Sequence, residues 1–263
     1  MTKKSYVVTG ASNGIGQALV GILLGAGHQV FGLDIVTPVQ PMDHFIELDL
    51  SNPQSIRAAC AKIPDGVDGI CNSAGLPPRD GIESRILEVN FLGTRDFTNQ
   101  LQDKLNEGAS IVNLASRAGH GWPQGVEQVK RFARLSGASD VQQFVLKEEI
   151  GPIRAYDLSK EAIILWTMAN SETYLNRNMR INSISPGAVE TQIMDDFQTA
   201  FGERMTKNVA RAGRAGTAEE IAELAAFLLS PKSNWIKGSD ISIDGGMSAF
   251  VTSDRLSLDA LRD

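Results

Sequence analysis

The stretch that decides the fold is Thr9-Gly-Ala-Ser-Asn-Gly-Ile-Gly16, which follows a short apolar run at residues 6–9 and opens a helical pattern over residues 14–26. Glycines in such a turn let the backbone approach a pyrophosphate group, whose charge is stabilised by the N–H groups and the dipole at the helix start. The stretch therefore predicts a dinucleotide-binding loop. Its candidate cofactor-binding residues are Gly10, Ser12, Asn13, Gly14, Ile15 and Gly16.

Short apolar runs alternate with helical patterns through the rest of the chain, and no repeat or linker divides it. This order predicts an α/β fold in which residues 1–263 form one domain: a single Rossmann-type doubly wound sheet of seven parallel strands with helices on both faces. The predicted strands are residues 6–9, 29–33, 45–48, 69–72, 110–114, 180–184 and 240–243. The predicted helices are residues 14–26, 53–62, 81–107, 155–177 and 218–229, with Ser51 and Thr217 as N-caps.

Composition excludes several classes of partner. The 263 residues carry 25 basic and 31 acidic side chains, a net charge of −6 with no Lys/Arg stripe, so nucleic acid is not an expected partner. Residues 5–33 contain no charged side chain, but their glycines and polar residues rule out a spanning helix or an export signal. Cys60 and Cys71 lack metal-ligand spacing and suit a reducing compartment. We expect a cytoplasmic protein with no membrane partner and no metal.

A carboxylate follows the second predicted strand, where Asp34 lies 18 residues after Gly16. At this position a carboxylate accepts hydrogen bonds from both ribose hydroxyls and repels a 2′-phosphate. The next residue is Ile35, and neither it nor the glycine loop supplies a basic side chain for an extra phosphate. The sequence therefore favours NAD over NADP as cofactor.

Further motifs are spread along the rest of the chain. They are Asp49-Leu50, Asn72-Ser73-Ala74-Gly75, Val89-Asn90-Phe91-Leu92-Gly93, Ser116, Tyr156-x-x-x-Lys160, Pro186-Gly187-x-x-x-Thr191 and Asp244-Gly245-Gly246. Tyr156 and Lys160 alone would be a common helix pair, but in this combination the chain resembles the short-chain dehydrogenase/reductase family. The resemblance implies catalytic roles for Asn90, Ser116, Tyr156 and Lys160, with Ser116 on the substrate oxygen and Asn90 holding a water beside the lysine.

The resemblance also implies how the cofactor is held. It places Asp49 and Leu50 at the adenine, and the strand end at Asn72, Ala74 and Gly75 beneath the ribose and nicotinamide. It assigns Val189 and Thr191 to the carboxamide, and Pro186 and Gly187 to a turn of the chain over the nicotinamide ring. Tyr156 and Lys160 also contact the cofactor in this assignment. Ser73 is a departure, because the family more often has there a second Asn that braces neighbouring strands.

Tyr156 and Lys160 lie four residues apart, hence on one helix face. A lysine ammonium about 4 Å from the phenol contributes about 4 kcal/mol at an effective dielectric of about 20, which lowers the tyrosine pKa from about 10 to about 7. Desolvation opposes part of this effect. We therefore expect Tyr156 to act as general base in alcohol oxidation and as general acid in carbonyl reduction.

Ser116 and Tyr156 are 40 residues apart, a longer connection than most family members have, which indicates an insertion at about 119–154. Its apolar spacing predicts two short amphipathic helices. The chain here resembles the branch with bacterial 3-alpha-hydroxysteroid dehydrogenase/carbonyl reductase and coniferyl-alcohol dehydrogenases, which implies a hydrophobic alcohol or ketone. A substrate lid is expected at about 188–216. His120 is interpreted as an ordinary loop residue, with a place in the pocket as the alternative. Candidate pocket residues are Leu76, Ser116, Trp122, Met194 and Phe197.

The leading hypothesis is an NAD-dependent oxidoreductase that interconverts a hydrophobic secondary alcohol, cyclic and steroid- or terpenoid-like, with its ketone. One alternative is an aryl or allylic primary alcohol dehydrogenase of the coniferyl type. Another is a non-catalytic NAD(H) sensor, against which the intact Ser116, Tyr156 and Lys160 argue. The family commonly assembles through its helices, so a homodimer or homotetramer is expected.

Overall fold

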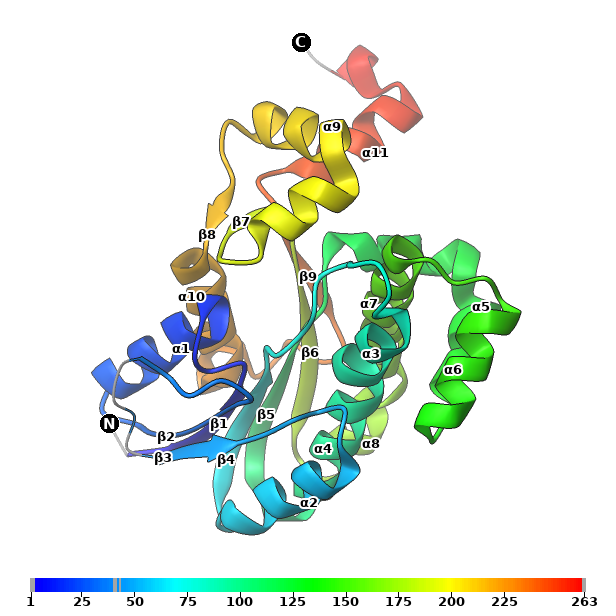
Figure 1. The fold of residues 1–263 in the computed structure, drawn as a ribbon. Coiled ribbons are helices and arrows are strands. Elements are labelled where there is room, and N and C mark those ends of the chain that lie inside the picture. Colours follow the sequence, from blue (N-terminus) through cyan, green and yellow to red (C-terminus); the bar gives the residue numbers. More distant parts are fainter. Residues whose placement is uncertain (1–2, 40–41, 43, 262–263) are drawn as a thin grey trace.

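The computed structural model describes residues 3–39, 42 and 44–261, and its centre is a parallel sheet of seven strands in the order β3-β2-β1-β4-β5-β6-β9 (Figure 1). The sheet confirms the predicted fold class. Because the chain leaves β1 and β4 on opposite sides of the sheet, their carboxyl ends form the switch point at which open α/β sheets bind ligands. The strands are β1 (Ser5–Thr9), β2 (Gln29–Asp34), β3 (His44–Glu47), β4 (Val67–Asn72), β5 (Leu105–Leu114), β6 (Arg180–Pro186) and β9 (Asp240–Ile243).

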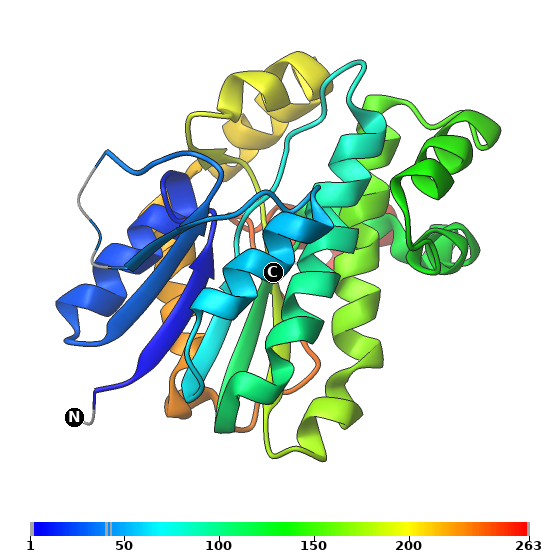
Figure 2. The same ribbon diagram turned by 60° about the horizontal axis from the view of Figure 1, so that its bottom comes forward.

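Helices cover both faces of the sheet (Figures 1 and 2). On one face, α1 (Gly14–Gly25) and α10 (Ala218–Leu229) share a core with alternate residues of the strands, such as Val8 and Val112. On the other face, α2 (Pro53–Lys62), α4 (Thr94–Leu101), α7 (Pro152–Ala169) and α8 (Ser171–Leu175) pack over the remaining strand residues. Strands buried on both faces explain the near-continuous apolar runs of the sequence.

The predicted helix over residues 81–107 is confirmed as helical over residues 83–104, but it is not one α-helix and it ends before residue 107. The chain instead forms α3 (Glu83–Leu87), a π-helical turn η1 (Glu88–Gly93), α4 and a 3-10 turn η2 (Gln102–Lys104), after which β5 already begins at Leu105. The first part of β5 is exposed and polar, so it lacks the apolar signal of a buried strand. Its pairing with β4 is also interrupted by an irregularity between Val67 and Gly69.

Three other predicted helix ends can be compared with the helices of the structure. The predicted helix over 155–177 starts earlier, at Pro152, a residue that needs no N–H partner in a first turn, and breaks into α7 and α8. Ser51 is not the N-cap of α2, because Asn52 accepts a hydrogen bond from the Gln54 amide at 2.9 Å and Ser51 donates its hydroxyl to Asp49. Thr217 is confirmed as the N-cap of α10 and forms a capping box with Glu220.

The insertion contains the two predicted amphipathic helices, α5 (Trp122–Ala133) and α6 (Ala138–Lys147). Their apolar faces form one core with α3, η1 and α7, in which the rings of Phe91 and Phe132 lie 5.3 Å apart. Figure 1 shows both helices beside α7 at one edge of the molecule. The inserted segment therefore supports the helix that carries Tyr156 and Lys160.

The segment predicted as a lid leaves the sheet through β7 (Val189–Glu190) and returns through β8 (Gly216–Thr217), and these two strands pair with each other. Between them, α9 (Met194–Ala212) is kinked at Gly202, whose φ is +50°. Two ion pairs fix its ends, Arg79 with Asp196 at 2.7 Å and Arg211 of α9 with Asp254 of α11 (Met247–Leu256) at 2.6 Å. Among the residues described, no helix is long and apolar enough to cross a membrane.

Candidate active site

A cavity of about 1150 Å³ lies at the carboxyl ends of the strands and extends beneath α9. It brings together most of the residues predicted for the site. Ser12, Gly16, Asn72, Asn90, Trp122 and Met194 do not line it. The predicted residues that line it are Gly10, Asn13, Gly14, Ile15, Asp34, Asp49, Leu50, Ala74, Gly75, Leu76, Ser116, Tyr156, Lys160, Pro186, Gly187, Val189, Thr191 and Phe197.

The glycine loop packs too closely for side chains. Gly10 has a φ of +68°, and a Cβ there would lie 2.9 Å from the Ala74 backbone. A Cβ on Gly16 would lie 2.1 Å from the Gly10 carbonyl oxygen, so the helix start is pressed against the loop. Gly14, with a φ of +54°, faces the Thr191 side chain, which a Cβ would approach to 3.3 Å. The start of α1 thus opens into the cavity as a dinucleotide-binding loop requires.

Asp34 ends β2 at the rim of the cavity. Its carboxylate accepts hydrogen bonds from the Ser12 amide at 3.0 Å and the Val36 amide at 3.1 Å. Ser12 therefore lies behind the carboxylate, and its hydroxyl donates to the Val36 carbonyl. These contacts hold a negative charge next to the glycine loop, and the side chain that follows, Ile35, is apolar and half exposed.

Asp49 and Leu50 follow β3 and line the same end of the cavity. The Asp49 carboxylate accepts from the Ser51 amide at 2.9 Å and lies 3.7 Å from the Arg85 guanidinium. Arg85 also lines the cavity, although no sequence motif singled it out. The paired charges make this end polar beside the buried Leu50.

Asn72, at the end of β4, turns away from the cavity. Its amide donates to Thr98 of α4 at 2.9 Å and to Asn113 of β5 at 2.8 Å, which braces the two strands in spite of the Ser73 departure. The Thr9 hydroxyl accepts from the amides of Ser73 and Ala74, and this fixes the strand end. Ala74 and Gly75 then form the cavity wall.

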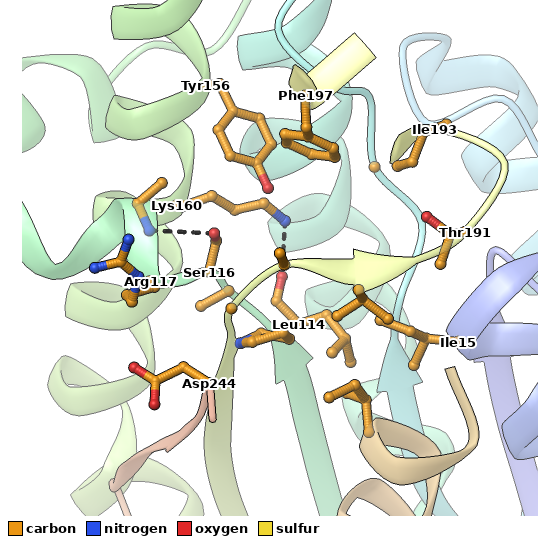
Figure 3. Close-up of a pocket in the computed structure, with 18 of the residues that line it drawn as sticks. Ile15, Leu114, Ser116, Arg117, Tyr156, Lys160, Thr191, Ile193, Phe197 and Asp244 are labelled. Atoms are coloured by element: carbon orange, nitrogen blue, oxygen red, sulfur yellow. Dashed lines mark hydrogen bonds between the residues drawn. The ribbon is translucent and has the colours of Figure 1, made fainter. Parts of the chain in front are cut away.

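Three side chains converge on one wall of the cavity (Figure 3). Ser116 follows β5 and accepts a hydrogen bond from the Ala118 amide at 3.1 Å. Tyr156 and Lys160 come from α7, with the lysine Nζ 5.7 Å from the centre of the tyrosine ring and 2.8 Å from the Leu114 carbonyl oxygen, to which it donates. The tyrosine ring also contacts Phe197, so α9 packs against it.

The pKa of Tyr156 differs from the sequence expectation. Burial raises this pKa above its usual range, and a hydrogen bond with Ser116 lowers it in part. Burial also lowers the pKa of Lys160 to about 8. The expected lowering of the Tyr156 pKa towards 7 is therefore wrong for this arrangement. The lysine ammonium is directed at the Leu114 carbonyl, and apolar packing excludes water from the phenol.

Asn90 lies within the π-helical turn η1, a type of distortion that often occurs at functional sites. Its side chain is fully engaged: Oδ1 accepts from the Leu76 amide at 2.7 Å, and Nδ2 donates to the Leu76 carbonyl and to Ser159. A Cβ on Gly75 would lie 3.3 Å from the Asn90 oxygen and 3.6 Å from the Lys160 Nζ. Asn90 and Lys160 therefore both lie close to Gly75.

The cavity is lined by both apolar and polar side chains. Leu76 and Phe197 line it, whereas Trp122 packs into the core of the insertion. The sequence did not single out three further apolar residues of α9 and α11, whose amphipathic patterns were their only signal: Val209, Met247 and Val251. Nor did it single out the polar residues Gln124, Arg154 and Ser248, whereas His120, for which a place in the pocket was one of two interpretations, does line the cavity.

Comparison with known proteins identifies the family. The chain is 34% identical to coniferyl-alcohol dehydrogenase from Pseudomonas sp. (strain HR199 / DSM 7063) over 95% of this chain and 98% of that protein. The chain belongs to the short-chain dehydrogenase/reductase family. Residues 4–127 match the family model described as short chain dehydrogenase, and residues 141–248 match the model described as enoyl-(acyl carrier protein) reductase.

Two other short-chain dehydrogenases extend this result. The 3-alpha-hydroxysteroid dehydrogenase/carbonyl reductase of Comamonas testosteroni is 29% identical over 93% of this chain and 96% of its own. The crystal structure of the 3-alpha-hydroxysteroid dehydrogenase from Pseudomonas sp. B-0831 complexed with NADH matches with a TM-score of 0.81 and 28% identity, covering 94% of this chain and 98% of that one. The chain is thus an oxidoreductase related to enzymes that act on alcohols and carbonyls.

Proposed function

We propose that this protein is an NAD-dependent oxidoreductase that interconverts a hydrophobic secondary alcohol, cyclic and steroid- or terpenoid-like, with its ketone. The observation that carries the proposal is the convergence of Ser116, Tyr156 and Lys160 on a cavity that also contains a glycine loop and the Asp34 carboxylate. The structural relative complexed with NADH supports the choice of cofactor.

The residues present fit NAD. Close packing at Gly10 and Gly14 brings main-chain N–H groups to the cavity, where they would hold the pyrophosphate, and Asp34 would hold the ribose hydroxyls. Gly75 leaves a space beside Lys160 that any side chain would fill. When bound, the nicotinamide supplies the hydride or accepts it.

The side chains of the chain move the proton. Tyr156 is protonated at neutral pH because its buried phenol has a raised pKa, so it can donate its proton to the oxygen of a ketone as the carbonyl carbon receives hydride. The Ser116 oxygen already accepts from the Ala118 amide, which leaves its own hydrogen to donate to the reacting oxygen. The Lys160 ammonium stabilises the tyrosinate that results. Alcohol oxidation runs these steps in reverse.

The side chains that line the cavity indicate which substrates it can bind. Phe197, Phe201, Met205 and Met247 offer an apolar surface suited to a bulky ring system. A second candidate substrate is an aryl or allylic primary alcohol of the coniferyl type. The 34% identity to coniferyl-alcohol dehydrogenase favours it.

The test is initial-rate NADH formation and consumption with steroid, monoterpenoid and aryl alcohols and their carbonyl partners, in parallel with NADP. We expect turnover of one hydrophobic class, faster with NAD. Tyr156→Phe should abolish turnover and leave NADH binding, followed by fluorescence, unchanged. Tyr174→Phe is the matched control, because Tyr174 is buried in α8 away from the cavity.

Three results would count against the proposal. Faster turnover with NADP would overturn the cofactor assignment. Near-normal turnover by Tyr156→Phe would overturn the mechanism. NADH binding without turnover of any substrate in the panel would favour the non-catalytic sensor.

We also propose a homodimer or homotetramer in the cytoplasm. Trp235 is 94% exposed in the isolated chain, and tryptophan is enriched at protein interfaces relative to the rest of the surface. Light scattering coupled to size-exclusion chromatography should show a dimer or tetramer that Trp235→Ala weakens. A monomer at micromolar concentration would contradict this assignment.

A further inference from the structure

The turn that carries Ser116 is pressed against the catalytic helix on one side. Ser116 caps the 3-10 turn η3 (Arg117–Gly121): its hydroxyl oxygen accepts from the Ala118 amide at 3.1 Å, and its carbonyl accepts from the Gly119 amide at 2.8 Å. A Cβ on Gly119 would lie 2.8 Å from the backbone carbonyl of Lys160. The direction of the Ser116 hydroxyl therefore depends on where η3 is held.

The opposite side of η3 is held by His120. Its Nε2 lies 3.3 Å from Asp240 Oδ2, and its Nδ1 lies 3.4 Å from the Ser248 hydroxyl. Asp240 is itself fixed, because its carboxylate accepts from the hydroxyls of Ser183 at 2.6 Å and Ser185 at 2.9 Å. The imidazole thus joins η3 to the ends of β6 and β9 through a largely buried carboxylate.

The same network reaches the cofactor side of the cavity. The Ser248 hydroxyl and amide both donate to Asp244 Oδ2, the amide at 2.8 Å. Asp244 abuts the turn after β6, since a Cβ on Gly187 would lie 3.0 Å from the Asp244 Cα. The network around His120 therefore connects η3, and with it Ser116, to the turn after β6.

We propose that His120 is a positioning residue, which holds η3 so that the Ser116 hydroxyl points at the reacting oxygen. The inference rests on the proposed function of Ser116 as a donor to substrate. The side chain of His120 is 31% exposed and lines the cavity, but its two nitrogens are directed at Asp240 and Ser248. It therefore acts through the protein and not on the substrate.

The first test compares His120→Ala with His120→Gln. Loss of the anchor should lower kcat about tenfold in the alanine variant, with the NADH dissociation constant and the melting temperature nearly unchanged. The amide nitrogen of glutamine can donate to Asp240, so His120→Gln should recover most of the activity. His28→Ala is the matched control, because His28 lies at the amino end of β2 and accepts from the Lys4 amide. Loss of melting temperature with normal kcat would overturn the proposal.

A double-mutant cycle separates positioning from substrate contact. In a Ser116→Ala background, His120→Ala should change kcat by no more than about twofold, because the group it positions is gone. If the full tenfold loss persists in that background, His120 acts independently of Ser116 and the proposal is wrong.

Hydrogen exchange gives a readout that does not depend on turnover. The amides of Ala118 and Gly119 donate to Ser116, so His120→Ala should accelerate their exchange by about fivefold or more, and His120→Gln should restore protection. Unchanged exchange in His120→Ala overturns the proposal even if no substrate is found. Accelerated exchange in a protein without turnover would support the anchor while the proposed function fails.

Discussion

The electrostatics of the site can be tested through the folding stability of Lys160→Met as a function of pH. Lys160 is 6% exposed, and burial lowers its pKa from 10.5 to about 8. A lysine whose pKa is lower in the folded protein than in the unfolded chain destabilises the fold. This destabilisation is fully present below about pH 8 and diminishes as the pH rises from 8 to 10.5, because only the unfolded chain then holds the proton.

The magnitude follows from the two pKa values. The difference between pKa values of 8 and 10.5 corresponds to a destabilisation of the folded state by about 3 kcal/mol. Between pH 7 and pH 9.5 this destabilisation decreases by about 2 kcal/mol. The methionine variant lacks this titration. The unfolding free energy of the wild type should therefore rise by about 2 kcal/mol relative to the variant over this range. The hydrogen bond to the Leu114 carbonyl is lost at both pH values, so the comparison across pH cancels it.

The assay is urea unfolding followed by tryptophan fluorescence at pH 7, 8.5 and 9.5. Tyr156 has a raised pKa and stays protonated in the folded state across this range, so it adds little to the difference. Lys207→Met is the control, because the side chain of Lys207 is 78% exposed and its removal should leave no such pH dependence. A wild-type-minus-variant difference that is flat with pH for Lys160→Met would refute the conclusion that burial governs this lysine.

Three further variants test how the site is supported. Glu161→Ala should lower the unfolding free energy by about 3 kcal/mol in urea titrations, because it leaves Arg154 without its buried bidentate partner; a loss under about 1 kcal/mol would contradict this. Gly119→Ala should reduce kcat about tenfold and lower the melting temperature, since its Cβ meets the α7 backbone at 2.8 Å; normal kcat would show that η3 can shift freely. Thr217→Ala should lower the unfolding free energy by about 1 kcal/mol, and no change in urea would mean that the capping box is dispensable.

Local patterns were enough to predict the sheet and much of the candidate site. The glycine loop, Asp34 and Ser116 each lie at the carboxyl end of a strand, and the carboxyl ends of parallel strands must meet at one edge. The insertion helices were also predictable, because the apolar spacing around Phe132 and Phe144 gives each helix a single buried face.

The features of the fold and of the site that local patterns did not predict depend on contacts between residues far apart in the sequence. The π-helical turn at Asn90 accompanies hydrogen bonds to Leu76, 14 residues earlier, and no local propensity specifies it. His120 meets Ser248 across 128 residues, so a loop histidine gave no sign of its role. The direction of the Tyr156 pKa shift was not predicted for the same reason, because the side chains that shield the phenol from water, such as Phe197, come from another part of the chain.

Enclosure of the candidate site by α9 and α7 explains the shifted pKa values of both Tyr156 and Lys160. The packing that holds Tyr156 against Phe197 favours its neutral phenol, and the same burial favours the neutral amine of Lys160. A ketone therefore meets a tyrosine that holds its proton. Once that proton is transferred, the tyrosinate and the Lys160 ammonium become opposite charges in a dry site, where their attraction is stronger than in water. Burial that disfavours each charge alone thus favours the pair that proton transfer creates.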